Sequence, residues 1–269
     1  MSAAVSVSGV TKVFNAGRAD EVVALSDVDL TVGDGEFVSL IGPSGCGKST
    51  LLRLIADLIA PTAGTVTIAG RPAAAARQKQ GYGIAFQQAG LFEWRTVLRN
   101  VELPLELRGL ARADRRTRAL EMLDLVGLSD FTAHYPGQLS GGMQQRVAIA
   151  RALAVSPPLL LMDEPFGALD EMTRERLQGE LLQICAKTGT STVFVTHSIS
   201  EAVFLSNRVV VMSPRPGRIT DSIDVSLPTR DDAARQSPAY FEAITEVRRA
   251  LRGTPAPAPR PGEPSAVKP

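Results

Sequence analysis

The chain has 269 residues, of which 44% are hydrophobic and 21% are charged, and its formal net charge is +1. This length allows one sizeable core with room for a small second lobe. The near-neutral balance excludes the global basic field that attracts nucleic acid and the charge excess of a disordered chain, although a local basic patch is still compatible with it.

The cysteines and the apolar runs show which broad class of protein the chain belongs to. Cys46 and Cys185 are the two cysteines, too few for a disulfide framework or a structural zinc site, and they indicate reduced thiols in a cytosolic protein. The first residues lack the pattern of a signal peptide. No stretch approaches the ~20 apolar residues of a membrane helix. We therefore expect any membrane role to come through a partner.

The first elements of the chain read as strand, helix, strand, strand. Residues 36–41 (EFVSLI) are a short, mostly apolar run and predict a buried strand. Residues 49–58 carry apolar side chains at helical spacing and predict a helix. Residues 65–69 and 83–86 predict two more strands. From about 88 to 156 the sequence predicts a helical lobe, with helices over 112–127 and 142–154.

The α/β pattern then resumes. Strands are expected over residues 159–162, 192–196 and 209–212, and helices over 174–187 and 238–252. Strands that alternate with helices predict a mostly parallel sheet with helices on its faces. Residues 253–269 are dominated by Pro and Ala and predict a disordered tail, because such a segment cannot build a core.

A phosphate-binding loop lies between the first predicted strand and helix. Residues 42–49 read GPSGCGKS and match the pattern G-x-x-x-x-G-K-S/T in full. The glycines let backbone N–H groups turn towards phosphate oxygens, and the helix N-terminus favours negative charge. Lys48 is expected to reach the β- and γ-phosphates, and the Ser49 hydroxyl to bind Mg²⁺. The candidate nucleotide-binding residues here are Gly42, Pro43, Ser44, Gly45, Cys46, Gly47, Lys48, Ser49 and Thr50.

The strand predicted over 159–162 ends in two carboxylates. Asp163 at its carboxyl edge is placed to hold a metal ion beside the phosphates. Glu164, one residue later, can orient and polarise an attacking water as a general base. An exposed acidic turn would have the same sequence, but the phosphate loop in the same chain favours the catalytic interpretation.

Two further features leave alternatives open. A predicted helix begins at Ser140, Gly141 and Gly142, with the serine at the N-cap. The two glycines have no side chains and leave the backbone amides accessible. This pattern suits an anion site and equally an ordinary capped helix. His197 follows the strand over 192–196, where it can meet a γ-phosphate, although a structural histidine would also fit.

Taken in order, these motifs resemble the ATP-binding-cassette family, specifically the nucleotide-binding subunits of ABC transporters, over about residues 5–252. The most specific match is residues 139–146, LSGGMQQR, which is similar to the family's signature sequence. The resemblance implies an α/β fold: a phosphate-loop NTPase core of ABC type with an inserted helical subdomain (about 88–156) and a small antiparallel β part. It implies an ATP-binding domain over 5–236, a C-terminal helix over 237–252 and a tail over 253–269.

The resemblance also implies roles for single residues. Two copies, or one copy and a related ATPase subunit, would pair head to tail around two ATP molecules. Ser140 and Gly142 would then contact the γ-phosphate held by the other copy's Lys48, and Gly141 between them would also belong to the nucleotide-binding site. Gln87 would join the Mg²⁺ site, formed with Ser49 and Asp163, to the helical lobe. Asp170 would reach across the dimer to the other copy. The residues with an implied part in catalysis are Glu164, His197, Lys48 and Gln87. Phe14 falls where the family stacks an aromatic ring on adenine, although a core phenylalanine is the alternative.

Three segments narrow the subgroup. Residues 169–177, 194–205 and 212–219 are similar to importers of the nitrate, sulfonate and taurine group, which includes carriers of thiamine or pyrimidine precursors. This likeness implies an ATP-hydrolysing subunit at the cytoplasmic face of the membrane. Its partners would be an integral-membrane permease and a periplasmic or lipid-anchored solute-binding protein, with no nucleic acid. Two positions depart from the pattern: Asp57 stands where the family has glycine, and Glu93 where the group has proline.

Two other functions fit the sequence less well than an importer subunit. A soluble ABC ATPase acting on DNA or ribosomes would carry a long coiled-coil insertion, zinc-binding cysteines or a second cassette, and the segment from Gln87 to Ser140 leaves room only for a compact lobe. A catalytically inert nucleotide-binding module conflicts with the presence of Lys48, Glu164 and His197 together.

Overall fold

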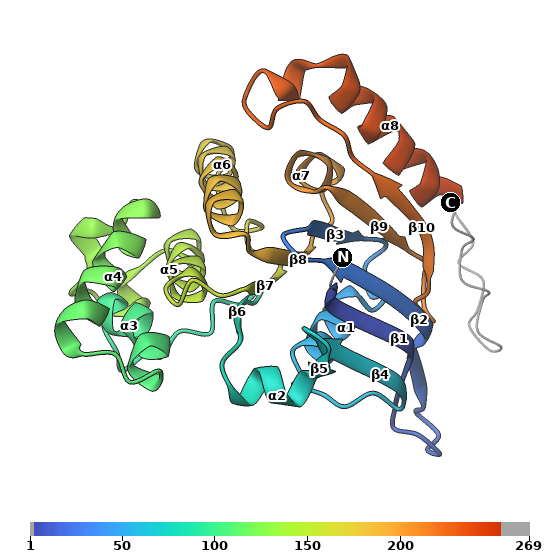
Figure 1. The fold of residues 1–269 in the computed structure, drawn as a ribbon, viewed down its shortest axis with the longest axis horizontal. Coiled ribbons are helices and arrows are strands. Elements are labelled where there is room, and N and C mark those ends of the chain that lie inside the picture. Colours follow the sequence, from blue (N-terminus) through green and yellow to red (C-terminus); the bar gives the residue numbers. More distant parts are fainter. Residues whose placement is uncertain (1–2, 254–269) are drawn as a thin grey trace, which may run out of the picture.

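The computed structural model describes residues 3–253 and contains two β-sheets, and most of its helices pack around the larger one (Figure 1). The larger sheet has the strand order β10-β9-β3-β8-β7-β6, and the smaller sheet the order β2-β1-β4-β5. The strands are β1 Ala3–Phe14, β2 Val22–Gly33, β3 Phe37–Ile41, β4 Ala63–Ile68, β5 Arg71–Pro72, β6 Tyr82–Ala85, β7 Leu159–Asp163, β8 Ser191–Val195, β9 Arg208–Met212 and β10 Ile219–Asp224. The α-helices are α1 Lys48–Ile55, α2 Ala73–Gln78, α3 Val97–Leu107, α4 Arg112–Leu125, α5 Gly141–Leu153, α6 Glu171–Thr188, α7 Ile199–Leu205 and α8 Pro238–Gly253.

The larger sheet is parallel through its centre, as the sequence predicts, and β10 adds an antiparallel edge that was not predicted. Strands β3, β7 and β8 are buried along their whole length, which is typical of parallel strands covered on both faces. Alternate residues serve opposite faces. In β7, Leu160 and Met162 pack in the core shared with α5 to α8, whereas Leu159 and Leu161 pack in the core shared with α1 and the smaller sheet.

The smaller sheet is antiparallel and is built around the long pair β1 and β2. The family resemblance predicts a small antiparallel part, but the sequence pattern alone does not mark either strand. The cause is visible in the pairing, where the register between β1 and β2 shifts at several points along the two strands. Each shift breaks the strict alternation of apolar and polar residues that identifies a strand in a sequence.

Helices α3, α4 and α5 pack together at one end of the molecule, away from the smaller sheet (Figure 1, green). Helices α4 and α5 lie within one or two residues of their predicted bounds, and Gly127, with a φ of +66°, follows the end of α4. Helix α3 was not predicted individually. It contains Pro104, and its first turn is held by buried Asn100, whose side chain donates hydrogen bonds to the carbonyls of Phe92, Arg95 and Thr96.

The helix predicted over 49–58 ends earlier than expected, at Ile55. Asp57 adopts a φ of +53°, which leaves the helical region, and Leu58 is therefore 47% exposed instead of packing in the core. Glycine takes this left-handed conformation without strain, which accounts for the family's preference at this position. The Asp57 carboxylate is only partly exposed, because it accepts a hydrogen bond of 2.9 Å from Arg77 Nε.

The remaining predicted elements lie within a few residues of their observed bounds. The largest difference is at α6, which begins at Glu171 rather than 174 because the side chain of Asp170 caps its N-terminus. The predicted tail lies outside the described residues, apart from Gly253 at the end of α8. Within residues 3–253, none of the helices combines the length and apolar character needed to cross a membrane.

Candidate functional site

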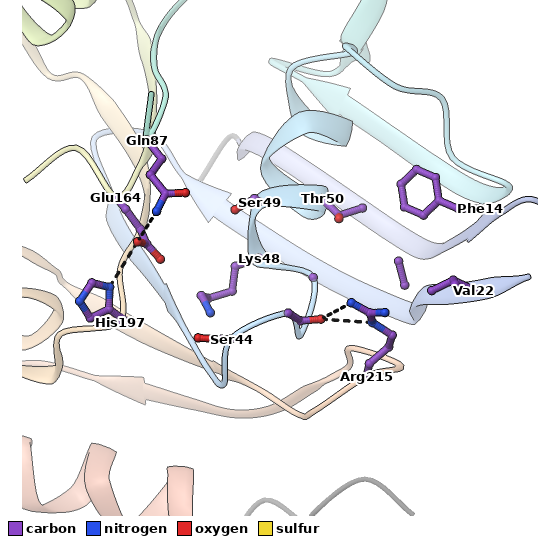
Figure 2. Close-up of a pocket in the computed structure, with 13 residues that line it drawn as sticks. Phe14, Val22, Ser44, Lys48, Ser49, Thr50, Gln87, Glu164, His197 and Arg215 are labelled. Atoms are coloured by element: carbon purple, nitrogen blue, oxygen red, sulfur yellow. Dashed lines mark hydrogen bonds and ion pairs between the residues drawn. The ribbon is translucent and has the colours of Figure 1, made fainter. Parts of the chain in front are cut away.

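The carboxyl ends of the parallel strands open onto a cavity of about 760 Å³. Four parallel strands deliver residues to it: β3 leads into the phosphate loop, β6 into Gln87, β7 into Glu164 and β8 into His197. Ligand sites of open α/β sheets form at this edge. The lining residues are Phe14, Val22, Ala24, Ser44, Gly45, Gly47, Lys48, Ser49, Thr50, Gln87, Glu164, His197 and Arg215 (Figure 2).

The phosphate loop is held in shape by its lysine and its glycines. Lys48 is 6% exposed, and its Nζ donates to the carbonyl oxygens of Gly42 at 2.7 Å and Pro43 at 3.0 Å. Gly47 has a φ of +109°, and a Cβ there would lie 2.6 Å from Leu25 Cδ2. A side chain at this position would meet both backbone strain and a steric clash, so the glycine is required by the packing.

Cys46 does not line the cavity, and its side chain is fully buried. Its Sγ lies 3.7 Å from Lys48 Nζ. The side chain fills the interior of the loop, and its thiol lacks the solvent access that is typical of redox-sensor cysteines. Gly42 and Pro43 also do not line the cavity and contribute through the loop backbone.

Two of the three predicted metal ligands, Ser49 and Asp163, are in contact, whereas the third, Gln87, donates its hydrogen bond to Glu164. Ser49 Oγ donates a hydrogen bond of 2.8 Å to Asp163 Oδ1. Asp163 is 3% exposed, and this burial raises its pKa, an effect that the Ser49 hydrogen bond opposes. Mg²⁺ prefers oxygen ligands and is usually bound by one or two carboxylates together with phosphates and waters. The hydroxyl and carboxylate therefore fit Mg²⁺; residues 3–253 contain no cluster of three or more His, Cys, Asp or Glu that could hold a metal on its own.

The raised pKa of Asp163 has a consequence for stability. The folded protein binds the Asp163 proton more readily than the unfolded chain does, so the free energy of unfolding decreases as the pH rises through the folded-state pKa. We expect Asp163→Asn, without nucleotide or metal, to raise the Tm at pH 7.5, because it removes the buried ionised carboxylate. The gain should vanish near pH 3, below the ordinary Asp pKa of about 3.9, where the folded and unfolded states both carry the proton. Thermal scans at both pH values check this, with exposed Asp221→Asn as the control; a lower Tm at pH 7.5 would contradict it.

Glu164 is the centre of a polar triad (Figure 2). Its Oε2 accepts a hydrogen bond of 3.2 Å from Gln87 Nε2 and lies 3.3 Å from His197 Nδ1. Its backbone has a φ of +49°, and its N–H donates to the carbonyl of Val195 at 2.9 Å, which ties the end of β7 to β8. A non-glycine residue in this conformation is held there by its surroundings, as residues at functional sites often are.

The backbone around His197 is fixed by a buried carboxylate. Thr196 Oγ1 donates to Glu201 Oε2 at 2.6 Å and accepts a hydrogen bond of 3.0 Å from the N–H of Ser198. Gln178 Nε2 donates to the other oxygen of Glu201 at 3.3 Å. These contacts hold the residues on both sides of His197 and leave its own side chain 67% exposed and facing the cavity.

This arrangement predicts the effect of removing Glu201. Glu201→Ala leaves the buried hydroxyl of Thr196 and the buried amide of Gln178 without their partner, a loss worth about 1–3 kcal/mol. We expect the Tm to decrease by roughly 2–10 °C and ATP turnover to decrease with it, because His197 loses its support. Exposed Glu246→Ala on α8 is the matched control, and a Tm unchanged in both variants would contradict the network.

The residues of the signature segment lie outside this cavity. Ser140 caps α5, and its Oγ accepts a hydrogen bond of 3.3 Å from the N–H of Met143. Asp170 caps α6, and the hydrogen bond from the Thr173 backbone lowers its pKa. The two helix starts approach each other, since a Cβ on Gly142 would lie 3.0 Å from the Ala168 carbonyl. None of Ser140, Gly141, Gly142 and Asp170 lines the cavity of its own chain.

Phe14 lies at the far end of the cavity from Glu164 (Figure 2). Its side chain is 38% exposed, and Lys12 Nζ lies 5.1 Å from the centre of its ring. The ring is therefore available to a ligand and is not part of the core.

Three residues that line the cavity were not predicted from the sequence. Val22 and Ala24 belong to β2, whose sequence has no clear strand pattern. Arg215 lies in a segment that indicated only a likeness to one subgroup of the family.

A protein-family model described as "ABC transporter" matches residues 25–167. The chain belongs to the ABC transporter family. Its relatives include an uncharacterized ABC transporter ATP-binding protein of Methanocaldococcus jannaschii, 48% identical over 94% of this chain and 92% of the relative. The taurine import ATP-binding protein TauB of Yersinia pestis is 48% identical over 77% of this chain and 80% of its own length. The nitrate import ATP-binding protein NrtD of Synechocystis is 43% identical over 92% of this chain and 94% of its own length.

Solved structures agree with this assignment to the ABC transporter family. A dimeric structure of the ATP-binding cassette MJ0796, described as a post-hydrolysis state bound to ADP and phosphate, has a TM-score of 0.77 and 39% identity, and it covers 82% of this chain and 99% of that one. The predicted fold class, an ABC-type α/β core with a helical part and an antiparallel β part, is confirmed. The protein is an ABC transporter ATP-binding protein with an ATPase fold.

Proposed function

We propose that this chain is the ATP-hydrolysing subunit of an ABC importer, with Glu164 as the general base. The observation that carries the proposal is the placement of Glu164 in one cavity with the phosphate loop, within 3.2 Å of Gln87 and 3.3 Å of His197. A carboxylate in hydrogen-bond reach of a water beside the γ-phosphate is what water activation requires.

The chemistry follows from the positions of these groups. Lys48 and the loop amides bind the β- and γ-phosphates, and Ser49 and Asp163 hold Mg²⁺, which would neutralise charge that develops on the phosphates. Glu164 orients a water and takes its proton as the water oxygen bonds to the γ-phosphorus. The bond to the oxygen between the β- and γ-phosphorus breaks at the same time and leaves ADP. Gln87 and His197 hold the Glu164 carboxylate and face the γ-phosphate.

We infer that the second half of the site comes from another copy of the chain. Ser140, Gly141, Gly142 and Asp170 lie outside the cavity of their own chain, and Ser140 and Gly141 are exposed at the start of α5. A helix N-terminus with bare amides favours an anion. The dimeric state of the MJ0796 cassette supports this arrangement. Nucleotide that contacts both copies binds the closed dimer more tightly than the open one, and so drives closure.

The named relatives support an importer of small solutes. TauB is described as a taurine import protein and NrtD as a nitrate import protein, so the proposed solute is taurine-, sulfonate- or nitrate-like, or a thiamine or pyrimidine precursor. We place the subunit at the cytoplasmic face of the membrane, with an integral-membrane permease and a solute-binding protein as partners. We also propose the division into an ATP-binding domain over 5–236, with the helical subdomain at about 88–156, and a C-terminal helix over 237–252.

The test is reconstitution of the chain in proteoliposomes with the permease and solute-binding protein encoded beside it. The expected result is ATP-dependent uptake of one of taurine, nitrate or a thiamine precursor, and faster ATP hydrolysis when the loaded binding protein is present. Co-purification with ribosomes or DNA, combined with no stimulation by any permease, would instead favour a soluble ABC ATPase.

A further inference from the structure

The loop between β9 and β10 packs against both β2 and the phosphate loop. The N–H of Gly217 donates to the carbonyl of Ala24 at 3.0 Å, and the N–H of Ser26 donates to the carbonyl of Gly217 at 3.0 Å. A Cβ on Gly217 would lie 2.0 Å from the carbonyl oxygen of Cys46. The backbone of this loop therefore packs directly against the backbone of the phosphate loop, with no space for a side chain between them.

Arg215 reaches from this supporting loop to the nucleotide cavity. Its Nη2 and Nε lie 3.1 Å and 3.3 Å from the carbonyl oxygen of Gly45, and both donate to it (Figure 2). The side chain also lines the cavity, on the stretch of wall between Lys48 and Phe14 (Figure 2). Within residues 3–253, its Nη1 donates to no protein acceptor and no carboxylate forms an ion pair with the guanidinium.

We propose that Arg215 is a nucleotide-binding residue that holds the phosphate loop through Gly45 and donates from Nη1 to the α-phosphate of the bound nucleotide. The inference rests on the proposed placement of ATP in this cavity. With the triphosphate end at Lys48 and the base at Phe14, the α-phosphate lies along the stretch that Arg215 lines. An unpaired guanidinium favours an anionic oxygen there, and its planar fork allows one edge to hold Gly45 while the other meets the phosphate.

This placement separates Arg215 from the groups that act on the γ-phosphate. Glu164, Gln87 and His197 gather at the other end of the cavity (Figure 2). Loss of Arg215 should therefore weaken the binding of any nucleotide that carries an α-phosphate, with little effect on the chemical step. Uniform binding of substrate and transition state raises affinity and leaves kcat unchanged.

The experiment compares Arg215→Ala and Arg215→Lys with the control Arg218→Ala. Arg218 lies on the same loop and donates from Nη2 to Ser26 Oγ at 3.0 Å, but it does not line the cavity. Affinities for ATP, ADP, AMP and adenosine are measured by competition with a fluorescent ADP analogue, and kcat and KM by phosphate release. We expect Arg215→Ala to raise the Kd for ATP, ADP and AMP about tenfold, as for the loss of one charge-assisted hydrogen bond. The Kd for adenosine and kcat should change less than about threefold.

Arg215→Lys should recover part of the lost affinity, since it keeps the charge but not the fork. The inference is overturned if Arg215→Ala leaves the affinity for ATP unchanged, if adenosine binding weakens as much as ATP binding, or if Arg218→Ala has the same effect. An equal loss for adenosine would assign Arg215 to loop support alone. Failure of the wild-type protein to bind ATP would instead contradict the proposed function, so the two failures are distinct.

Discussion

Replacing Glu164 with glutamine is expected to lower the rate of ATP hydrolysis by at least about a hundredfold while ATP binding is kept, because the change removes a general base. The amide has nearly the shape of the carboxylate, so the contacts with Gln87 and His197 are disturbed little in geometry. Only the capacity to accept the proton of the water is lost. Phosphate release gives the rate, and titration with a fluorescent ATP analogue gives the affinity.

The same variant should reveal the dimer. Because ATP favours the closed state and Glu164→Gln does not hydrolyse it, closed dimers are expected to accumulate with ATP and to be seen by size-exclusion chromatography. Glu242→Gln, at an exposed residue of α8 outside the cavity, is the matched control and should behave as wild type. Hydrolysis at the wild-type rate in Glu164→Gln would remove Glu164 from the role of base.

The sequence was most informative where several neighbouring residues each have a specific structural or chemical requirement. The phosphate loop needs Gly47 for its positive φ and its close contact with Leu25, and Lys48 to bind the loop carbonyls. Such requirements confine the residue types over a short stretch and can be recognised without a structure. The parallel strands were also predictable, because burial on both faces gives continuous apolar runs such as 159–162.

The sequence was least informative where long-range contacts decide the structure. Strands β1 and β2 are irregular in register, and α1 ends early because Asp57 takes a positive φ that its residue type does not demand. Arg215 is 170 residues from Gly45 in the chain, and only the fold brings the two together. The roles of Glu164, Gln87 and His197 had a different basis, since they followed from family resemblance and from strand ends at one edge of the sheet. The direct contacts of Glu164 with the other two came from the structure.

Replacing Ser140 with arginine is the second change with a large expected effect. Ser140 is exposed at the start of α5 and absent from the cavity of its own chain, and in the proposed composite site it contributes to the nucleotide of another copy. A long cationic side chain in place of the cap would remove the γ-phosphate contact from the one composite site that this residue completes, and the other site of the dimer would be unaffected. We expect hydrolysis to decrease by at least about a hundredfold, the scale of losing one hydrogen-bond donor to the transition state, while binding of ATP by the monomer stays near wild type.

Loss of the cap alone costs about 0.5–2 kcal/mol of stability, so a control must separate a folding defect from the loss of the γ-phosphate contact. Ser140→Asn keeps a capping side chain and should preserve the Tm.

The decisive measurement mixes the Ser140→Arg variant with the Lys48→Ala variant, each of which is expected to be inactive alone. In a mixed head-to-tail dimer, the intact Lys48 of the first chain faces the intact Ser140 of the second, so one of the two sites is complete. Random pairing should therefore restore about a quarter of wild-type activity, because half of the dimers are mixed and each has one working site. A self-contained site predicts no recovery on mixing, and full activity of Ser140→Arg alone would exclude the composite site.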